Sequence, residues 1–239
     1  MSKTIKRIFL WSSPRNISTT LMYSFAQRSD TRVHDEPLYG YYLKSTNADK
    51  YHPGAEEIQK SMNCDGESVV EEMLTTEDKP VQFFKNMGHH LLGIDKSFTK
   101  DGYNVILTRD PKRMIASFSK VIENPSMKDI GYADQLTLAI YFKQNDIPFI
   151  VVDSKDILMD PSSKLKEICD FVGIPFEEEM LQWEKGARKE DGVWAKFWYA
   201  NVHRSEGFLE YKETNIDLPS NQNSLYKDAL NNYNSLLKL

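Results

Sequence analysis

Five short apolar runs, separated by helical patterns, are the feature that most constrains how this chain folds. The runs lie at residues 8–11, 31–34, 81–84, 103–107 and 148–152. They are continuous rather than alternating with polar residues, which is typical of parallel strands covered on both faces. Strands that alternate with helices form right-handed βαβ units. The sequence therefore predicts a three-layer α/β fold, with a central parallel sheet of about five strands flanked by helices.

Between the runs, apolar residues recur at the spacing of a helix. Four stripes stand at Leu21/Met22/Phe25/Ala26, Met114/Ile115/Phe118/Val121, Leu136/Ala139/Ile140 and Leu165/Ile168/Cys169/Val172. The last stripe begins after Asp160 and Pro161 and ends before Gly173, which are typical signals for the start and end of a helix. A further helix is predicted near residues 224–237. These stripes supply the helical layers that cover the sheet.

The length of 239 residues suits one large domain. We expect a single domain over residues 1–239, with a polar insertion near 41–78 and a C-terminal segment, 177–239, rich in Trp, Tyr, Asn and Lys. The chain has 30 basic and 35 acidic residues, a net charge of −5. This balance argues against a broad nucleic-acid-binding surface, although it allows a local basic pocket.

Neither the cysteines nor the apolar runs point to secretion or a membrane. Two cysteines, Cys64 and Cys169, provide neither a disulfide framework nor metal-ligand spacing, and they favour a reducing compartment. No apolar run approaches the roughly 20 residues of a membrane helix. The run at 8–11 is shorter than the apolar centre of a signal peptide, about 7–15 residues. We therefore expect a cytoplasmic protein without membrane or nucleic-acid partners.

The strongest local signal is the loop between the first strand and its helix. It consists of Pro14, Arg15, Asn16, Ile17, Ser18, Thr19 and Thr20. A helix N-terminus offers unpaired N–H groups to an anion, and Arg15 adds a charge able to bind phosphate or sulfonate oxygens. The alternative is an ordinary capped turn with a solvated Arg15. The loop lacks the G-x-x-x-x-G-K-S/T sequence, which disfavours an ATPase or GTPase.

A second signal lies where the fourth strand meets its helix. Arg109 ends the strand, Asp110 and Pro111 begin the helix, and Ser117 follows Arg109 after eight residues. Ser117 shares a helix face with Arg113. A long side chain from the strand end can meet Ser117 over a helix rise of about 9 Å. We expect Arg109 and Ser117 to hold one phosphate together.

Taken in order, these segments resemble the sulfotransferase family, P-loop-related enzymes that use 3′-phosphoadenosine 5′-phosphosulfate (PAPS). The family's P-K/R-S-G-S/T-S/T loop, which binds the 5′-phosphosulfate, is similar to residues 14–19. Its strand-end Arg and the Ser eight residues later, both on the 3′-phosphate, match Arg109 and Ser117. Residues 152–161 and the helix after them resemble the family's YEDL…DP…FLGL segment. The resemblance covers roughly residues 6–175 and implies a P-loop NTPase-like fold in a divergent, bacterial-type member.

The chain departs from the family pattern at several points. Ile17 stands where the family usually has Gly, and Ser154 replaces a Tyr of the third segment. After the third strand the chain reads KNMGHH at residues 85–90, in place of an intact K-T-H element. The adenine-side segment is faint, between residues 192 and 208. These departures favour, as an alternative, a protein that binds a nucleotide or anion without turnover.

Sulfuryl transfer needs a base for the acceptor hydroxyl. Glu36 is the first candidate, because it follows the second strand at the edge where ligands of open α/β sheets bind, and some family members place a Glu there. His89 and His90, after the third strand, are the second candidates. Lys85 matches the family's Lys that assists the bridging oxygen. The structural alternatives are a capping acid, two core histidines and a surface lysine.

The function that these residues favour is a PAPS-dependent sulfotransferase acting on a hydroxyl or amine of a small-molecule acceptor. PAPS is then a co-substrate, and no metal is expected because a sulfuryl group carries less charge than a terminal phosphoryl. A small-molecule kinase is a further alternative, opposed by the missing P-loop lysine. Seven aromatic residues can wall the acceptor or adenine pocket or belong to the core: Tyr39, Tyr41, Tyr42, Trp194, Phe197, Trp198 and Tyr199.

Overall fold

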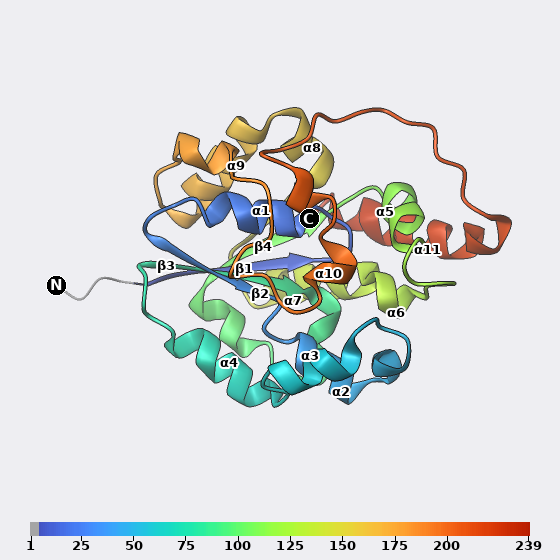
Figure 1. Ribbon diagram of the computed structural model, residues 1–239, viewed down its shortest axis with the longest axis horizontal. Coiled ribbons are helices and arrows are strands. Elements are labelled where there is room, and N and C mark those ends of the chain that lie inside the picture. Colours follow the sequence, from blue (N-terminus) through green and yellow to red (C-terminus); the bar gives the residue numbers. More distant parts are fainter. Residues whose placement is uncertain (1–4) are drawn as a thin grey trace.

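A parallel five-stranded sheet forms the centre of the computed structural model, which describes residues 5–239 (Figure 1). Its strands are β1 (Lys6–Ser12), β2 (Thr31–Asp35), β3 (Val81–Met87), β4 (Tyr103–Thr108) and β5 (Phe149–Asp153). Their order is β2-β3-β1-β4-β5, and every neighbouring pair is parallel. The predicted α/β class and parallel sheet are confirmed. Each strand continues past its predicted apolar run at the carboxyl end. The residues that directly follow the five runs are polar: Ser12, Asp35, Lys85, Thr108 and Asp153.

The helices begin and end at recognisable sequence signals. They are α1 (Ser18–Phe25), α2 (Tyr39–Ser45), α3 (Ala55–Ser61), α4 (Gly66–Thr75), α5 (Pro111–Phe118), α6 (Met127–Ile130), α7 (Tyr132–Gln144), α8 (Ser154–Met159), α9 (Pro161–Val172), α10 (Ala195–Trp198) and α11 (Asn223–Leu236). The Asp110 carboxylate accepts a hydrogen bond from the Arg113 N–H at the start of α5, and Asp160 accepts one from Ser163 at the start of α9. Both are N-caps followed by Pro at the first helical position.

Successive side chains of β1 pack on opposite faces of the sheet. Ile8 and Leu10 pack with the helices α1 and α9, whereas Phe9 and Trp11 pack with α4 and α7. Figure 1 shows α1, α8 and α9 on one side of the sheet and α4 and α7 on the other. A strand buried on both faces has to be continuously apolar, which explains the pattern from which the sheet was predicted.

Two predicted helical stripes differ from those in the structure. The helix α5 ends at Phe118, so Val121 lies beyond it and is 41% exposed. In α7 the buried face contains Gln135, Leu138 and Phe142, while Ile140 is 41% exposed. Gln135 takes an interior position because its side-chain amide donates to the backbone carbonyls of Trp11 and Leu107, at 3.2 and 2.8 Å. Buried hydrogen bonds therefore set the rotation of α7.

The segment near 41–78 contains the helices α2, α3 and α4 and covers part of one face of the sheet. Val69 and Met73 of α4 pack in the same cluster as Phe9 and Phe84, so this segment supplies part of one helical layer. Among residues 5–239, the structure contains no helix with the length and apolar character of a membrane span. All five strands point their carboxyl ends to the same edge of the sheet, which is where open α/β sheets bind ligands.

Candidate functional site

A pocket of about 770 Å³ opens at the carboxyl ends of the strands. This volume lies within the range of about 300–1,000 Å³ typical of small-molecule sites. All thirteen site residues predicted from the sequence line it: Pro14, Arg15, Asn16, Ile17, Ser18, Thr19, Thr20, Glu36, Lys85, His89, His90, Arg109 and Ser117. The fold thus brings the three predicted segments, and the loops after β2 and β3, to one cavity.

The loop after β1 has an unusual backbone. Arg15 has a φ of 60° and Ile17 a φ of 62°, both in the left-handed region. Ile17 is the N-cap of α1, and no side chain caps that helix. The first N–H groups of α1 are therefore not satisfied by a cap, and they carry the partial positive charge of the helix end. Such a loop suits an anion, and anion binding by it stays a prediction.

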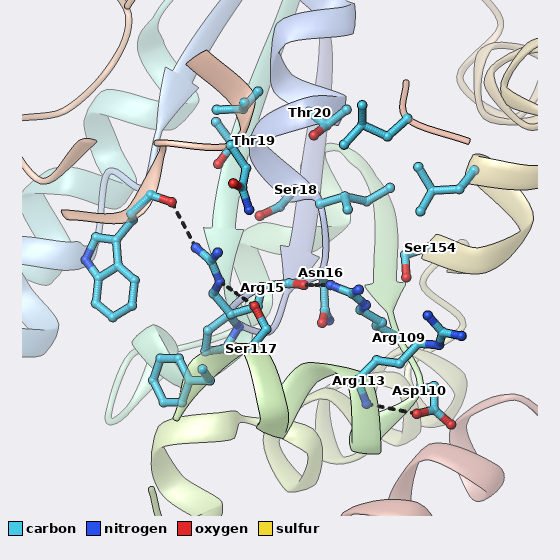
Figure 2. Close-up of a pocket in the computed structure, with 18 of the residues that line it drawn as sticks. Arg15, Asn16, Ser18, Thr19, Thr20, Arg109, Asp110, Arg113, Ser117 and Ser154 are labelled. Carbon is cyan, nitrogen blue, oxygen red and sulfur yellow. Dashed lines mark hydrogen bonds between the residues drawn. The ribbon is translucent and has the colours of Figure 1, made fainter. Parts of the chain in front are cut away.

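Two arginines and a serine are joined through the loop (Figure 2). Arg15 Nε donates to Ser117 Oγ at 3.1 Å, and Arg15 Nη1 donates to the Trp198 carbonyl at 2.9 Å. Arg109 Nη1 donates to the Arg15 carbonyl at 2.6 Å. Arg109 and Ser117 were expected to meet directly, whereas Arg15 links them here. Burial lowers the pKa of both guanidinium groups below its ordinary value, yet arginine remains charged in proteins.

A buried ionic network lies on the other side of the pocket, at the ends of β2 and β3. Lys85 is fully buried, and its ammonium donates to Asp35 Oδ1 at 2.7 Å, Glu36 Oε1 at 2.6 Å and the Tyr199 hydroxyl at 2.6 Å. The three donors of the lysine are thereby used. Tyr199 lies 2.8 Å from both Asp35 oxygens and also accepts from Trp194 Nε1 at 3.1 Å. Asp35 Oδ2 accepts from the Gly192 N–H at 3.1 Å.

Within this network, Glu36 uses one of its two carboxylate oxygens. Its Oε1 accepts from Lys85, while Oε2 has no hydrogen-bond partner among residues 5–239. Glu36 lines the pocket, so Oε2 is the acceptor position that remains for a ligand. Burial raises the pKa of Glu36, and Asp35 adds to the rise although Lys85 opposes it. Its φ of 49° places Glu36, like Arg15 and Ile17, in a strained conformation of the kind that clusters at functional sites.

A family model for the sulfotransferase domain matches residues 6–238 of this chain. The chain belongs to the sulfotransferase family. Two curated relatives, branched-chain-amino-acid aminotransferase-like proteins 1 and 2 of Arabidopsis thaliana, are 38% identical over 231 residues. The match covers 96% of this chain and 41% of each relative. This sulfotransferase domain therefore spans about two fifths of the length of the curated relatives.

Solved sulfotransferases share the fold at low sequence identity. The sulfotransferase domain from the curacin biosynthetic pathway matches with a TM-score of 0.54 and 16% identity, covering 96% of this chain and 99% of that one. A sulfotransferase from Alicyclobacillus acidocaldarius matches with a TM-score of 0.55 and 11% identity, covering 97% and 94%. These likenesses show that the five-stranded sheet and its helices are arranged as in sulfotransferases.

Ile17 lies where the family loop usually has a glycine, and its backbone conformation is one that suits glycine. A left-handed residue suits glycine, which has no Cβ, and costs an L-residue about 1–2 kcal/mol. In this chain the loop adopts the left-handed conformation with isoleucine at this position. The backbone therefore takes the course that a glycine would allow. Ile17 compensates part of the strain by packing against the core cluster of α1.

Replacing Ile17 by glycine is expected to give a more stable protein than replacing it by alanine, by about 1–2 kcal/mol. Both variants lose the isoleucine side chain, but alanine keeps the left-handed strain. At an ordinary loop position the order is the reverse, with alanine more stable by about 0.4–1 kcal/mol. Urea unfolding of the two variants measures the difference. An Ile17→Ala more stable than Ile17→Gly by about 0.4–1 kcal/mol would show that the loop is not strained at this residue.

His89 and His90 lie in the wall of the pocket, buried against aromatic rings. His90 stacks on Tyr39 and Tyr42, with ring centroids 5.2 and 4.5 Å apart, and His89 meets Tyr42 edge to face at 5.0 Å. The Nδ1 atoms of both histidines are buried without a hydrogen-bond partner. Burial lowers the pKa of His89 to about 3 and that of His90 well below its ordinary value. Both imidazoles are therefore neutral at pH 7, and the catalytic assignment stays a prediction.

Several groups that line the pocket, and Asp35 beside it, were not singled out from the sequence. Asp35, His52 and Asp129 carried no motif, and Tyr199 was noted as an aromatic wall rather than as a hydrogen-bond partner of Lys85. One signal was present for Asp35, which stands beside Glu36 at the end of a predicted strand. The structure also places Lys85 in the interior rather than on the surface. Among the described residues no three His, Cys, Asp or Glu side chains are grouped to hold a metal.

Proposed function

We propose that this protein transfers a sulfuryl group from PAPS to a hydroxyl or amine of a small-molecule acceptor. The observation that carries the proposal is the pairing of two sites in one pocket: a cationic loop at the end of β1, and a buried carboxylate with a free oxygen at the end of β2. The first suits a phosphosulfate, and the second suits removal of a proton from the acceptor.

The cationic side of the pocket fits a nucleotide with more than one anionic group. Arg15, Arg109, Lys112, Arg113 and Lys155 line it, above the ends of β1, β4 and β5. Arg113 Nη2 is buried without a hydrogen-bond partner, its nearest carboxylate oxygen on Glu213 lying 3.6 Å away. A buried unpaired donor is costly, so it marks a place where a phosphate oxygen would bind well. In this proposal residues 14–20 hold the 5′-phosphosulfate, and Arg109 and Ser117 the 3′-phosphate.

The residues of the pocket divide the work of transfer among themselves. PAPS supplies a sulfuryl group whose S–O bond to the 5′-phosphate breaks as a bond from the acceptor forms, leaving adenosine 3′,5′-bisphosphate. Glu36 Oε2 accepts the proton of the acceptor. Lys85 holds Glu36 in place by a hydrogen bond, and Asp35 and Tyr199 hold Lys85 in turn. These three bonds use all the donors of Lys85, so it has none left for another group. Arg15 and the N-terminus of α1 stabilise the charge that develops on the phosphosulfate.

The charge of the network makes Glu36 suitable as a base. Two carboxylates share one ammonium group, so the network has a net charge of about −1. When one carboxylate takes up a proton, this net charge becomes zero. Tyr199 and Gly192 hold Asp35 with further hydrogen bonds, whereas Glu36 has Lys85 alone among side-chain donors. The proton therefore goes to Glu36. In this assignment His89 and His90 line the acceptor side as neutral groups, and Lys85 positions the base instead of touching the bridging oxygen.

Replacing Arg109 by alanine is expected to weaken binding of adenosine 3′,5′-bisphosphate at least about tenfold, because a charge-assisted contact is worth roughly 1.5–3 kcal/mol. Binding of AMP, which lacks the 3′-phosphate, should change much less. Isothermal titration calorimetry with both nucleotides measures the two effects. Arg32→Ala, which removes a half-exposed arginine outside this pocket, is the matched control. Equal affinity of the wild type for the two nucleotides would exclude a 3′-phosphate site.

Incubation with PAPS and a panel of hydroxyl and amine acceptors tests the proposed function as a whole. Release of adenosine 3′,5′-bisphosphate together with a sulfated product is the expected result. Tight binding of the nucleotide without any product would instead favour a non-catalytic binding protein. Turnover of ATP in the same assay, with no use of PAPS, would favour a kinase and overturn the proposal.

A further inference from the structure

We infer that the acceptor carries an ammonium group beside the hydroxyl or amine that receives the sulfuryl group, an inference that rests on the proposed function. It comes from the distribution of charge and aromatic rings around the pocket. The order of strands divides the pocket into two sides, because β2 and β3 lie on one side of β1 and β4 and β5 on the other. Glu36 follows β2 and is bonded to Lys85 of β3, so we take the side chains that follow these two strands as the acceptor side.

Cations and carboxylates are separated between these two sides. The cations that line the pocket, within residues 5–239, are Arg15, Lys85, Arg109, Lys112, Arg113, Lys155 and Lys212. Lys85 alone among them stands on β2 or β3, and its charge is taken by Asp35 and Glu36. Among the other cations of residues 5–239, Arg15 is the one nearest to this side, since its Nη1 donates to the Trp198 carbonyl, and the proposed function assigns Arg15 to the phosphosulfate. The acceptor side therefore offers no further unpaired cation to a carboxylate or phosphate of an acceptor. An anionic acceptor would meet like charge there, which is strongly unfavourable at a desolvated site.

Asp129 supplies a further negative charge on the acceptor side. It lines the pocket, and the Tyr51 hydroxyl donates to its Oδ1 at 2.5 Å while Ser126 donates to Oδ2 from its N–H and hydroxyl at 2.7 and 2.6 Å. A carboxylate has about four acceptor positions, so one remains open. Burial alone would raise the pKa of Asp129, but these hydrogen bonds outweigh burial and lower the pKa. Asp129 is therefore ionised at pH 7.

The wall between Glu36 and Asp129 is aromatic and uncharged. Tyr39 shares a 2.8 Å hydrogen bond with His52 Nδ1, and His52 Nε2 is buried without a partner, as are the Nδ1 atoms of His89 and His90. His89 and His90 are more than nine-tenths buried and line the pocket. Tyr39 and Trp194 line the pocket and meet edge to face, with ring centroids 5.2 Å apart. Trp198 stands between the two sides, because it stacks on Phe118 of α5 and lies 6.3 Å from His52. Aromatic faces attract an ammonium group, and neutral imidazoles do not oppose it.

The side of Asp129 is settled by its contacts. Tyr51 comes from the segment after β2, and a Cβ placed on Gly131, two residues after Asp129, would lie 2.8 Å from His89 Nδ1. Asp129 therefore stands beside the histidines that follow β3, across the acceptor side from the nucleotide cations. An ammonium group between Asp129 and the aromatic wall leaves the other end of a small acceptor free to reach Glu36.

Three phenols of similar size test the inference without requiring turnover. Tyramine, its neutral isostere 4-propylphenol and the anionic 4-hydroxyphenylacetate differ in the charge of one end, and their affinities are measured by calorimetry at pH 7 with and without adenosine 3′,5′-bisphosphate. We expect tyramine to bind at least about tenfold more tightly than 4-propylphenol, and 4-hydroxyphenylacetate to bind most weakly. Asp129→Asn should remove most of the advantage of tyramine. Asp134→Asn, which changes an acid outside the pocket, should keep it.

A second variant keeps the test decisive if Asp129→Asn disturbs the capping of α6. Glu36→Gln removes another negative charge and should also reduce the advantage of tyramine. Four results would overturn the inference. The three phenols bind equally, the carboxylate binds most tightly, tyramine fails to bind, or both variants keep the full advantage of tyramine. Binding of the bisphosphate in the same titrations reports on the proposed function separately. A protein that prefers tyramine but binds no nucleotide would contradict the proposed function and leave the charge preference standing.

Discussion

Replacing Glu36 by glutamine is expected to lower the rate of sulfuryl transfer by about 10²–10⁴-fold, the usual contribution of a general base. Glutamine preserves the shape of the side chain and can still accept the Lys85 hydrogen bond, so folding should change little. The affinity for adenosine 3′,5′-bisphosphate should stay the same, because Glu36 lies on the acceptor side of the pocket. A sulfate-transfer assay and calorimetry on the same variant measure the two quantities.

The pH dependence of transfer provides a sharper test of the same assignment. Burial raises the pKa of Glu36 above its ordinary value of 4.5, and only the ionised carboxylate accepts a proton. The rate of the wild type should therefore rise with pH through this raised pKa, and Glu36→Gln should lose that limb of the profile. His89→Ala and His90→Ala should lose less activity and keep the limb. A fully active Glu36→Gln beside an inactive histidine variant would move the base to the end of β3.

Replacing Lys85 by methionine is expected to destabilise the protein by about 3–5 kcal/mol, because it leaves buried carboxylates without their counter-ion. Lys85 is bonded to Asp35, Glu36 and Tyr199 inside the protein, so water cannot easily replace it. Urea unfolding at pH 7 measures the loss. Lys60→Met, which removes an exposed lysine paired with Glu56, should change the stability by at most about 1 kcal/mol.

The instability of Lys85→Met should depend on pH in a defined direction. Without Lys85, burial raises the pKa of Glu36 further, and a carboxyl group whose folded-state pKa is raised contributes stability that is lost as pH rises through that pKa. The variant should therefore approach the stability of the wild type near pH 4 and fall behind it toward pH 7. A loss of the same size at both pH values would mean that packing, rather than the unpaired carboxylates, destabilises the variant.

Local patterns were sufficient to predict the elements that build the site. Strand and helix formation depends on apolar spacing and on caps a few residues away, so the runs at β1 and β4 and the Asp110-Pro111 helix start could be recognised directly. The proposed anion-binding role of the loop after β1 rests on the same local facts, because a helix N-terminus and an arginine are neighbours in the chain. The common edge of the strand ends follows from a parallel sheet.

The partners of the site residues depended on the tertiary structure. Lys85 meets Glu36 because β2 and β3 are neighbours in the sheet, and it meets Tyr199 across 114 residues of chain. Ser117 bonds to Arg15 across 102 residues, although the motif suggested Arg109. The sequence by itself thus determined which side chains gather at the carboxyl edge, since each belongs to a local element. Only the packing decided which of them touch, because hydrogen bonds and burial depend on the strand order and on the C-terminal segment that closes over the sheet.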